Sequence, residues 1–318
     1  MELIKAVFNG KFDSLENIKV SPFSRAYTFS DSIYEVVPFY NSQPIEYDKH
    51  INRLQYSANA LSIKINLDII SDEIKKLISS CKSKSGYVYY QVTRGQDPIR
   101  SHIYSNDVEL ETFGYVLPHT FETKFLKIMI CKDLRWGRCD IKSTSLLGNV
   151  LSMNEAKEKG CDEVIMHNDN ILTEAGASNL FFVKDGDICT PALSNNILPG
   201  ITRQILIDTL SAIDINVYEK DFTLDDLTVA SSAWLTSSTK GMAPIEEIIN
   251  LDCDLIIKKK KKIYFLDFNP RFGGGYPFTH LSGLNYLYML IKKFPKNLKI
   301  NKPKLSKYTK GISINTLM

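Results

Sequence analysis

The stretch Arg135-Trp-Gly-Arg-Cys-Asp-Ile-Lys-Ser-Thr-Ser-Leu-Leu-Gly-Asn149 sets one lysine between basic residues and a polar turn. Lys142 follows the apolar Ile141, which the pattern places at the end of a strand, and a helix is expected to open near Leu147. A lysine that is desolvated near other cations has a lowered pKa, which suits it to Schiff-base chemistry. On position alone the commoner interpretation is a surface lysine, because burying an unpaired ammonium is costly.

Length and composition indicate a globular protein with room for two domains. The chain has 318 residues, of which 44% are hydrophobic and 24% are charged. Its net charge of +3 is too small to indicate binding to nucleic acid or a membrane surface. No apolar run is long enough to span a bilayer, and no signal peptide is evident. The six cysteines are scattered without a Cys-x-x-Cys pair, so we expect no metal site, no disulfide framework and a cytoplasmic location.

Strands that alternate with helices predict an α/β class in two domains. A small N-terminal α/β domain is expected over residues 1–120, with a short strand at 17–20, and a second domain over 121–250. The composition changes after about 250, where five lysines occupy 258–262. Residues 292–318 are rich in lysine and proline, which predicts a disordered tail.

Four elements of the chain can bind anions, although each has a plainer interpretation. The sequence Leu198-Pro-Gly-Ile201-Thr202-Arg203 places free backbone N–H groups at a helix start, which suits phosphate but is also an ordinary way to begin a helix. The run Thr236-Ser-Ser-Thr239 offers hydroxyls, as any polar loop does. Arg53 lies beside the apolar stripe of a helix, where a surface ion pair is common. Arg100-Ser-His102 places two cationic or donor side chains on one side of an extended segment, which suits a carboxylate or simply forms an exposed loop.

A carboxylate among small residues completes the set. Glu174 lies in Thr173-Glu-Ala-Gly-Ala-Ser178, where a flat ring can approach closely. Against a pyridine nitrogen, such a carboxylate holds a proton and strengthens the ring as an electron sink.

Taken in order, these stretches resemble the fold-type IV pyridoxal-phosphate enzymes, and among them most closely the D-amino-acid aminotransferases. The resemblance covers about residues 20–250. It rests on nine stretches: Ile33-Tyr-Glu-Val-Val, His50-Ile-Asn-Arg-Leu, Gln91-Val-Thr-Arg-Gly, Arg100-Ser-His, the segment 135–147, Asn154-Glu-Ala, Thr173-Glu, Ser178-Asn and Ile197-Leu-Pro-Gly-Ile-Thr-Arg203. Together they are a specific signal, whereas each alone is not.

The resemblance implies a two-domain fold with pyridoxal 5'-phosphate (PLP) between the domains, so that 121–250 becomes the PLP-binding domain. Lys142 then forms the Schiff base and moves the proton, and Glu174 binds the pyridine nitrogen. The other implied cofactor contacts are Arg53, Ser178, Leu198, Ile201, Thr202 and Ser238. The implied substrate contacts are Tyr34, Arg100, His102 and Thr239. In the D-amino-acid branch Arg100 and His102 reach in from the neighbouring subunit, which implies a homodimer.

The implied reaction is transamination of an amino acid, in the first place a D-amino acid such as D-alanine, with a 2-oxo acid such as 2-oxoglutarate. A branched-chain L-amino-acid aminotransferase or an aminodeoxychorismate lyase is the alternative within the fold type, and the Arg100-x-His102 pair with Tyr34 favours the D-branch. A degenerate protein that binds the cofactor or a partner without turnover is the alternative outside enzymes.

The sequence departs from the family pattern in four places, one of which is that alanine or glycine replaces two of the family's usual serines between Thr173 and Ser178. Ser30-Asp-Ser32 stands where the family has Gly-Asp-Gly, whose glycines allow unusual backbone angles. Arg100 lies one residue further from Gly95 than the family pattern predicts. Residues 251–291 resemble the final segment of ATP-grasp ligases, with Asp254, Asp267 and Asn269 at the magnesium positions. Because no ATP-grasp nucleotide-binding domain precedes this segment, we expect a non-catalytic appendage.

Overall fold

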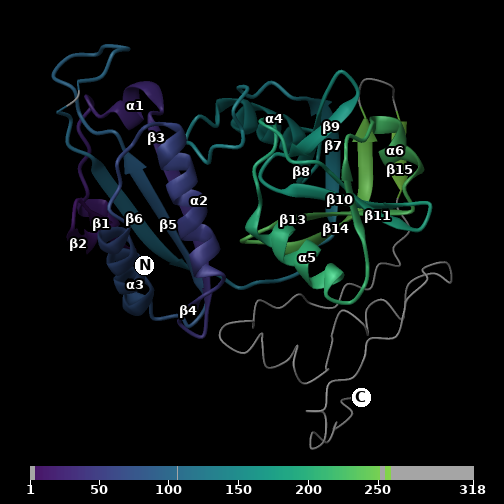
Figure 1. Cartoon of the computed structure of the whole chain (residues 1–318), viewed down its shortest axis with the longest axis horizontal. Helices are drawn as coiled ribbons and strands as arrows, with labels where there is room; N and C mark the ends of the chain where they lie inside the picture. Colours follow the sequence, from purple (N-terminus) through teal and green to yellow (C-terminus); the bar gives the residue numbers. More distant parts are fainter. Residues whose placement is uncertain (1–3, 106, 251–254, 259–318) are drawn as a thin grey trace, which may run out of the picture.

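Residues 4–105, 107–250 and 255–258 are described by a computed structural model, which places two β-sheets side by side (Figure 1). The first sheet has the strand order β2-β1-β6-β5-β3-β4 and antiparallel neighbours throughout. Its strands are β1 (Lys5–Phe8), β2 (Lys11–Ser14), β3 (Ser32–Tyr40), β4 (Gln43–Pro44), β5 (Gly86–Thr93) and β6 (Glu111–Pro118).

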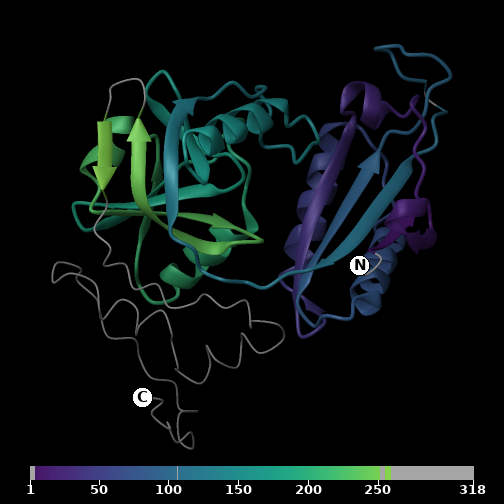
Figure 2. The same cartoon turned by 180° about the vertical axis from the view of Figure 1, so that it is seen from behind.

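Two amphipathic helices, α2 (Tyr47–Ala60) and α3 (Leu67–Ser80), form the core of this half with the sheet. Alternate residues of β3 and β5 turn inward, so Ile33, Val37, Val88 and Val92 pack against Leu54 and Ile74 of the helices, all of them buried. The short helix α1 (Arg25–Phe29) lies at one end of β3 and the 3₁₀ turn Leu15–Asn17 follows β2. A single connection after β6 leads to the second sheet, as Figure 2 shows from behind.

The second sheet is strongly curved and has the order β12-β11-β10-β13-β14-β7-β8-β9, with β15 paired to β14. Its strands are β7 (Leu126–Lys132), β8 (Glu163–Asn168), β9 (Ile171–Ala175), β10 (Asn179–Lys184), β11 (Asp187–Pro191), β12 (Val217–Lys220), β13 (Ser232–Ser237), β14 (Gly241–Asn250) and β15 (Leu255–Lys258). Three pairs, β7 with β8, β7 with β14 and β11 with β12, are parallel, and the rest are antiparallel. The long strand β14 bends, because its first residues pair with β13 and its last residues pair with β7 and β15.

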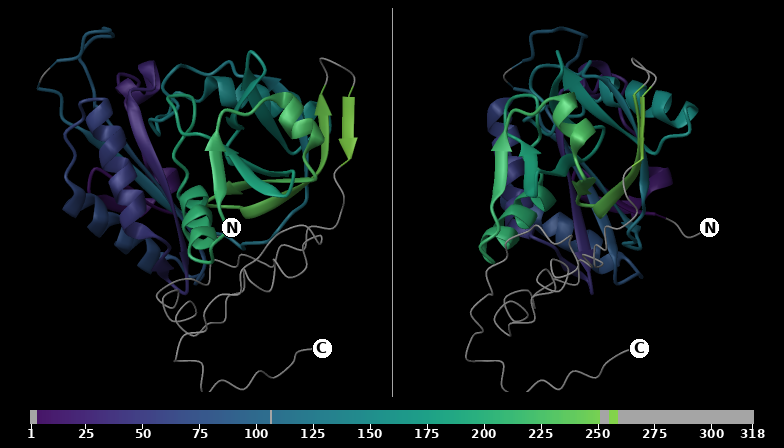
Figure 3. Two further views of the ribbon diagram at one scale, coloured as in Figure 1. Left: turned by 45° about the vertical axis from the view of Figure 1, so that its right-hand side comes forward. Right: turned by 90° about the vertical axis from the view of Figure 1, so that its right-hand side faces the viewer.

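Three helices accompany the second sheet: α4 (Leu147–Glu158), α5 (Ile201–Ser211) and α6 (Leu224–Val229). Its core is apolar on both faces of the central strands, where Phe181 and Trp234 stack with ring centroids 5.6 Å apart. In Figure 3, α5 lies on the side of the second sheet that faces the first half.

The α/β class expected from the sequence is confirmed, as are the starts of α4 at Leu147 and α5 at Ile201. Two local predictions are wrong. Lys142 does not end a strand: residues 133–146 form an irregular segment in which only Ser143 makes an isolated bridge, to Ile33 of β3. Residues 17–20 do not form a strand either, since β2 ends at Ser14, Asn17 ends the 3₁₀ turn and residues 18–20 are irregular.

Of the ATP-grasp-like segment 251–291, the structure describes only β15, and the tail 292–318 lies outside the described residues. Both interpretations therefore stay predictions. Within the described ranges, no helix combines the length and the hydropathy of a transmembrane span.

Candidate active site

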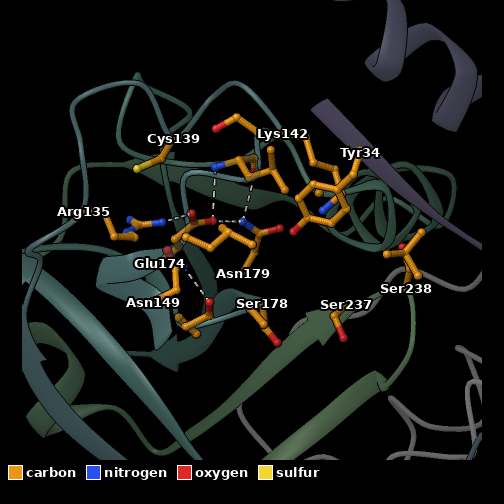
Figure 4. A pocket seen from close by; sticks show the side chains of 18 of the residues that line it. Tyr34, Arg135, Cys139, Lys142, Asn149, Glu174, Ser178, Asn179, Ser237 and Ser238 are labelled. Atoms are coloured by element: carbon orange, nitrogen blue, oxygen red, sulfur yellow. Dashed lines mark hydrogen bonds and ion pairs between the residues drawn. The ribbon is translucent and has the colours of Figure 1, made fainter. Parts of the chain in front are cut away.

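A cavity of about 440 Å³ opens between the two halves, and Lys142 lies in its wall (Figure 4). Tyr34, Val36 and Arg53 come from the first half. The other lining residues come from the irregular segment after β7, from α4, from the start of α5 and the turn before it, and from the ends of β9, β10 and β13 with the turns that follow β9 and β13. Ten residues predicted to form the site line this cavity: Tyr34, Arg53, Lys142, Glu174, Ser178, Leu198, Ile201, Thr202, Ser238 and Thr239.

Lys142 is fixed by its backbone to two elements of the first half, α2 and β3. Its N–H donates to Ser57 Oγ of α2 at 3.1 Å, and its carbonyl accepts from the N–H of Tyr34 in β3 at 2.9 Å. The ammonium Nζ then lies 4.3 Å from the centroid of the Tyr34 ring. This cation–π contact holds the amine beside the Tyr34 ring at the cavity wall.

Glu174 is the buried acid of the site, and three donors surround its carboxylate. Arg135 forms an ion pair with Oε1, while Asn179 Nδ2 and the backbone N–H of Leu198 donate to Oε2 at 3.0 and 3.1 Å. Burial raises the pKa of Glu174 to about 7, and the opposing attraction of Arg135 only partly offsets it. A carboxyl group with this pKa can hold or give up a proton near neutral pH.

The sequence analysis missed Arg135 as the partner of Glu174. Its guanidinium also donates to Asp133 at 2.6 Å and to the carbonyl of Asn196 at 2.9 Å, which clamps the start of the lysine-bearing segment. Burial by itself lowers the pKa of Arg135, but the carboxylates of Asp133 and Glu174 outweigh burial and raise it.

Arg53 is held by a buried carboxylate that the sequence analysis also missed. Glu35, 0% exposed in β3, accepts from Arg53 Nε at 2.7 Å and from Nη2 at 2.9 Å. His50 Nδ1 lies 2.8 Å from the same carboxylate. Burial alone raises the pKa of Glu35, but Arg53 and His50 together lower it well below its ordinary range. The pattern that could have revealed this is a charged residue at an inward position of an apolar strand.

The third donor of Arg53 reaches across to the second half. Nη1 donates to the carbonyl of Pro199 at 3.0 Å, directly before the Gly200 that precedes α5. A Cβ on Gly200 would lie 1.9 Å from Asn179 Oδ1, so only glycine fits here without a shift. The first N–H groups of α5, those of Ile201 and Thr202, have no partner within the helix and line the cavity, where they can bind an anion.

Unpaired hydroxyls complete this end of the cavity. Ser178 Oγ and Thr236 Oγ1 are buried and have no hydrogen-bond partner in the described part of the chain. Buried hydroxyls are normally satisfied, so these two indicate a ligand that supplies acceptors or donors. With Arg53 and the α5 N-terminus, they form a cradle for a polar, anionic group.

Arg100 and His102 are not part of the cavity in the same chain. They lie in the loop between β5 and β6, where both side chains contact the ring of Phe29. Residues 100 and 101 are irregular and the chain bends at 102 and 103, so this segment is not part of a strand.

The Ser30-Asp-Ser32 turn forms without glycine. Ser30 takes the left-handed conformation, with φ at 54°, and its N–H donates to the carbonyl of Ala26 at 3.2 Å to end α1. Asp31 then accepts from Arg25 and Arg94, and β3 begins at Ser32.

Comparison with known proteins places these features in one family. The model of the class IV amino-transferases matches residues 32–248. A D-alanine aminotransferase of Listeria monocytogenes serotype 1/2a (strain 10403S) is 37% identical over 254 residues, which cover 77% of this chain and 88% of the relative. One of Bacillus licheniformis is 33% identical over 251 residues, with the same coverage.

Solved structures of the same fold include a branched-chain aminotransferase of Thermoproteus uzoniensis, with a TM-score of 0.75 and 20% identity over 93% of this chain and 97% of that chain. A branched-chain amino acid aminotransferase of Thermobaculum terrenum, solved in its PLP form, has a TM-score of 0.69 and 20% identity over 77% of this chain and 86% of that chain.

Proposed function

This chain belongs to the class IV amino-transferase family, and on that premise we propose that it transaminates a D-amino acid, D-alanine in the first place, with a 2-oxo acid such as 2-oxoglutarate. The observation that carries the proposal is the meeting of three groups in one cavity. They are an amine that faces the cavity (Lys142), a buried acid with a pKa of about 7 (Glu174) and an anion cradle at the start of α5.

Class IV aminotransferases use PLP, and the residues of this cavity fit that cofactor. Its phosphate matches the cradle of Arg53, Ser178, Ile201, Thr202 and Ser238. The buried hydroxyls of Ser178 and of the neighbouring cavity residue Thr236 have no partner in the described part of the chain. When bound, PLP supplies an electrophilic carbon for amines and an electron sink for the substrate Cα.

The chain's own residues have separate tasks in this proposal. Lys142 Nζ holds the cofactor covalently and, once released, carries the proton of the substrate Cα. Glu174 holds a proton toward the ring nitrogen, and its three donors keep the carboxylate in place. Leu198 contributes the N–H that orients Glu174, and Thr239 lies at the substrate end of the cavity.

Selection of the D-isomer rests on the substrate carboxylate. We assign its binding to Tyr34 of the same chain and to Arg100 and His102 of a second copy, because these two lie outside their own cavity. The guanidinium and the imidazole suit a carboxylate by charge and by donor geometry. A homodimer is therefore part of the proposal. The free thiols of Cys81, Cys131, Cys139, Cys161 and Cys189 support the cytoplasm as its location.

The test is a coupled assay of purified protein with PLP and 2-oxoglutarate, in which pyruvate is measured after addition of D-alanine or L-alanine. Activity with D-alanine alone is expected, and Lys142→Ala abolishes it while Lys157→Ala, an exposed lysine of α4, leaves it intact. Activity confined to branched-chain L-amino acids assigns the chain to the other branch of the family. A protein that binds PLP but turns over no amino acid refutes the enzymatic proposal.

A further inference from the structure

The ring of Phe29, the last residue of α1, is shared by three side chains. The guanidinium carbons of Arg25 and Arg100 each lie 4.6 Å from the ring centroid, and the His102 ring centroid lies 5.3 Å away at an interplanar angle of 57°. The two side chains assigned to the substrate carboxylate therefore touch one aromatic ring. Figures 1 and 3 show α1 and the loop between β5 and β6 side by side at the outer end of the first sheet.

Arg25 fastens the backbone of the same loop. It is 4% exposed, and its Nη1 donates to Asp97 Oδ2 at 2.7 Å and to the carbonyl of Ser101 at 2.8 Å. Ser101 is the residue between Arg100 and His102. The loop is thus held at its centre through the backbone and on either side of that point through side chains.

A second arginine ties this assembly to the turn before β3. Arg94 Nε donates to Asp31 Oδ2 at 2.7 Å, the oxygen that also accepts from Arg25 Nε at 2.8 Å. The Arg94 guanidinium carbon lies 3.8 Å from the centroid of the Tyr104 ring, further along the loop. Asp31 is thus the common anchor of α1, the end of β5 and the loop.

The contact between Arg100 and Phe29 leaves the N–H donors of the guanidinium available. A guanidinium that contacts a ring through its flat face keeps its N–H donors free in the plane. When a guanidinium pairs with a carboxylate, its donors are occupied and its charge is neutralised. Within the described residues, Arg100 forms no ion pair. Its fork of donors therefore stays available for an incoming carboxylate.

We propose that Phe29 and Arg25 are positioning residues that preset Arg100 and His102 for the substrate carboxylate. This inference rests on the proposed function and deepens it, because it makes carboxylate recognition depend on α1. Ordering long side chains during binding lowers affinity, and a preset pair avoids that loss. Phe29 itself touches neither cofactor nor substrate in this proposal.

Steady-state kinetics of Phe29→Leu in the full chain with PLP test the inference. We expect KM for D-alanine and for 2-oxoglutarate to rise by about tenfold, which corresponds to about 1.4 kcal/mol, while kcat and the Kd of PLP stay at the wild-type values. Phe29→Tyr keeps the ring and is expected to restore the wild-type KM. Tyr27→Leu is the matched control, since Tyr27 lies on the same helix and is 78% exposed.

Arg100→Gln separates the outcomes. If wild-type protein is active and Arg100→Gln raises KM but Phe29→Leu does not, the positioning role is overturned and the proposed function stands. If Phe29→Leu changes KM, kcat and the Kd of PLP together, its role is general stability and the inference also fails. If wild-type protein does not turn over D-amino acids, the proposed function fails first. Should Phe29→Leu not fold, Phe29→Met, which keeps apolar volume without a ring, is read by the same criteria.

Discussion

Replacing Glu35 by glutamine tests the electrostatic account of the cofactor cradle. The substitution keeps the shape of the side chain but removes the charge that faces Arg53, at 2.7 and 2.9 Å, and His50, at 2.8 Å. Removing one partner of a buried ion pair costs about 3–5 kcal/mol, because the other charge stays behind without compensation. Since glutamine still offers one oxygen, we expect a loss of about 3 kcal/mol in the free energy of unfolding.

Urea unfolding followed by the fluorescence of Trp136 and Trp234 measures this loss. With saturating PLP, the difference in the free energy of unfolding between variant and wild type should become smaller, because the phosphate replaces the lost carboxylate as the partner of Arg53. The control is Asp72→Asn, which removes a 60% exposed partner of Lys76 and should cost at most about 1 kcal/mol.

The pH dependence of Glu35→Gln has a defined sign. The pKa of Glu35 is held below its ordinary value, so its contribution is present above the unfolded-state pKa and is lost as the pH falls. The variant should therefore lose part of the acid sensitivity of the wild type. In the cofactor-free protein, a loss no larger than that of the Asp72→Asn control would refute the reasoning.

Three further predictions concern single positions. Gly200→Ala should raise the Kd of PLP by at least about tenfold, because the new Cβ displaces Asn179. Gly137→Ala is the control and should leave this Kd unchanged, because a Cβ at position 137 meets no atom within 4 Å. Fluorescence titration with PLP measures both values. In the cofactor-free protein the Glu174 pKa lies at about 7 instead of 4.5, so stability falls as the pH rises between these values, and Glu174→Gln should flatten that slope in urea unfolding. Ser30→Gly should stabilise the protein by about 0.5–1 kcal/mol in the same assay, because glycine takes φ at 54° without strain, and a loss of stability contradicts this.

Part of the structure could be predicted from local sequence patterns and from the family resemblance. The α4 and α5 starts follow from short-range pattern, and the family resemblance led to ten residues that share one cavity. The strand expected before Lys142 does not form, because Asp133 and Asp140 bind arginines and the chain gains side-chain contacts instead of a ladder.

Long-range pairings could not be predicted in the same way. Arg135 and Glu174 are 39 residues apart, and nothing in either neighbourhood points to the other. Glu35 reads as one polar residue in an apolar strand, and only the packing of α2 on β3 brings Arg53 and His50 to it. The sequence shows that serine replaces the family's glycine at position 30, but not that Ser30 itself adopts the left-handed conformation.

The most direct test of the central claim traps the cofactor on the chain. The protein is loaded with PLP, mixed with D-alanine, L-alanine or buffer, reduced with borohydride and digested, and the phosphopyridoxyl group is located by peptide mass spectrometry. We predict that the group is found on Lys142 in buffer and with L-alanine, and that D-alanine removes it from the peptide. A group attached to another lysine, or equal loss with both isomers, contradicts the account.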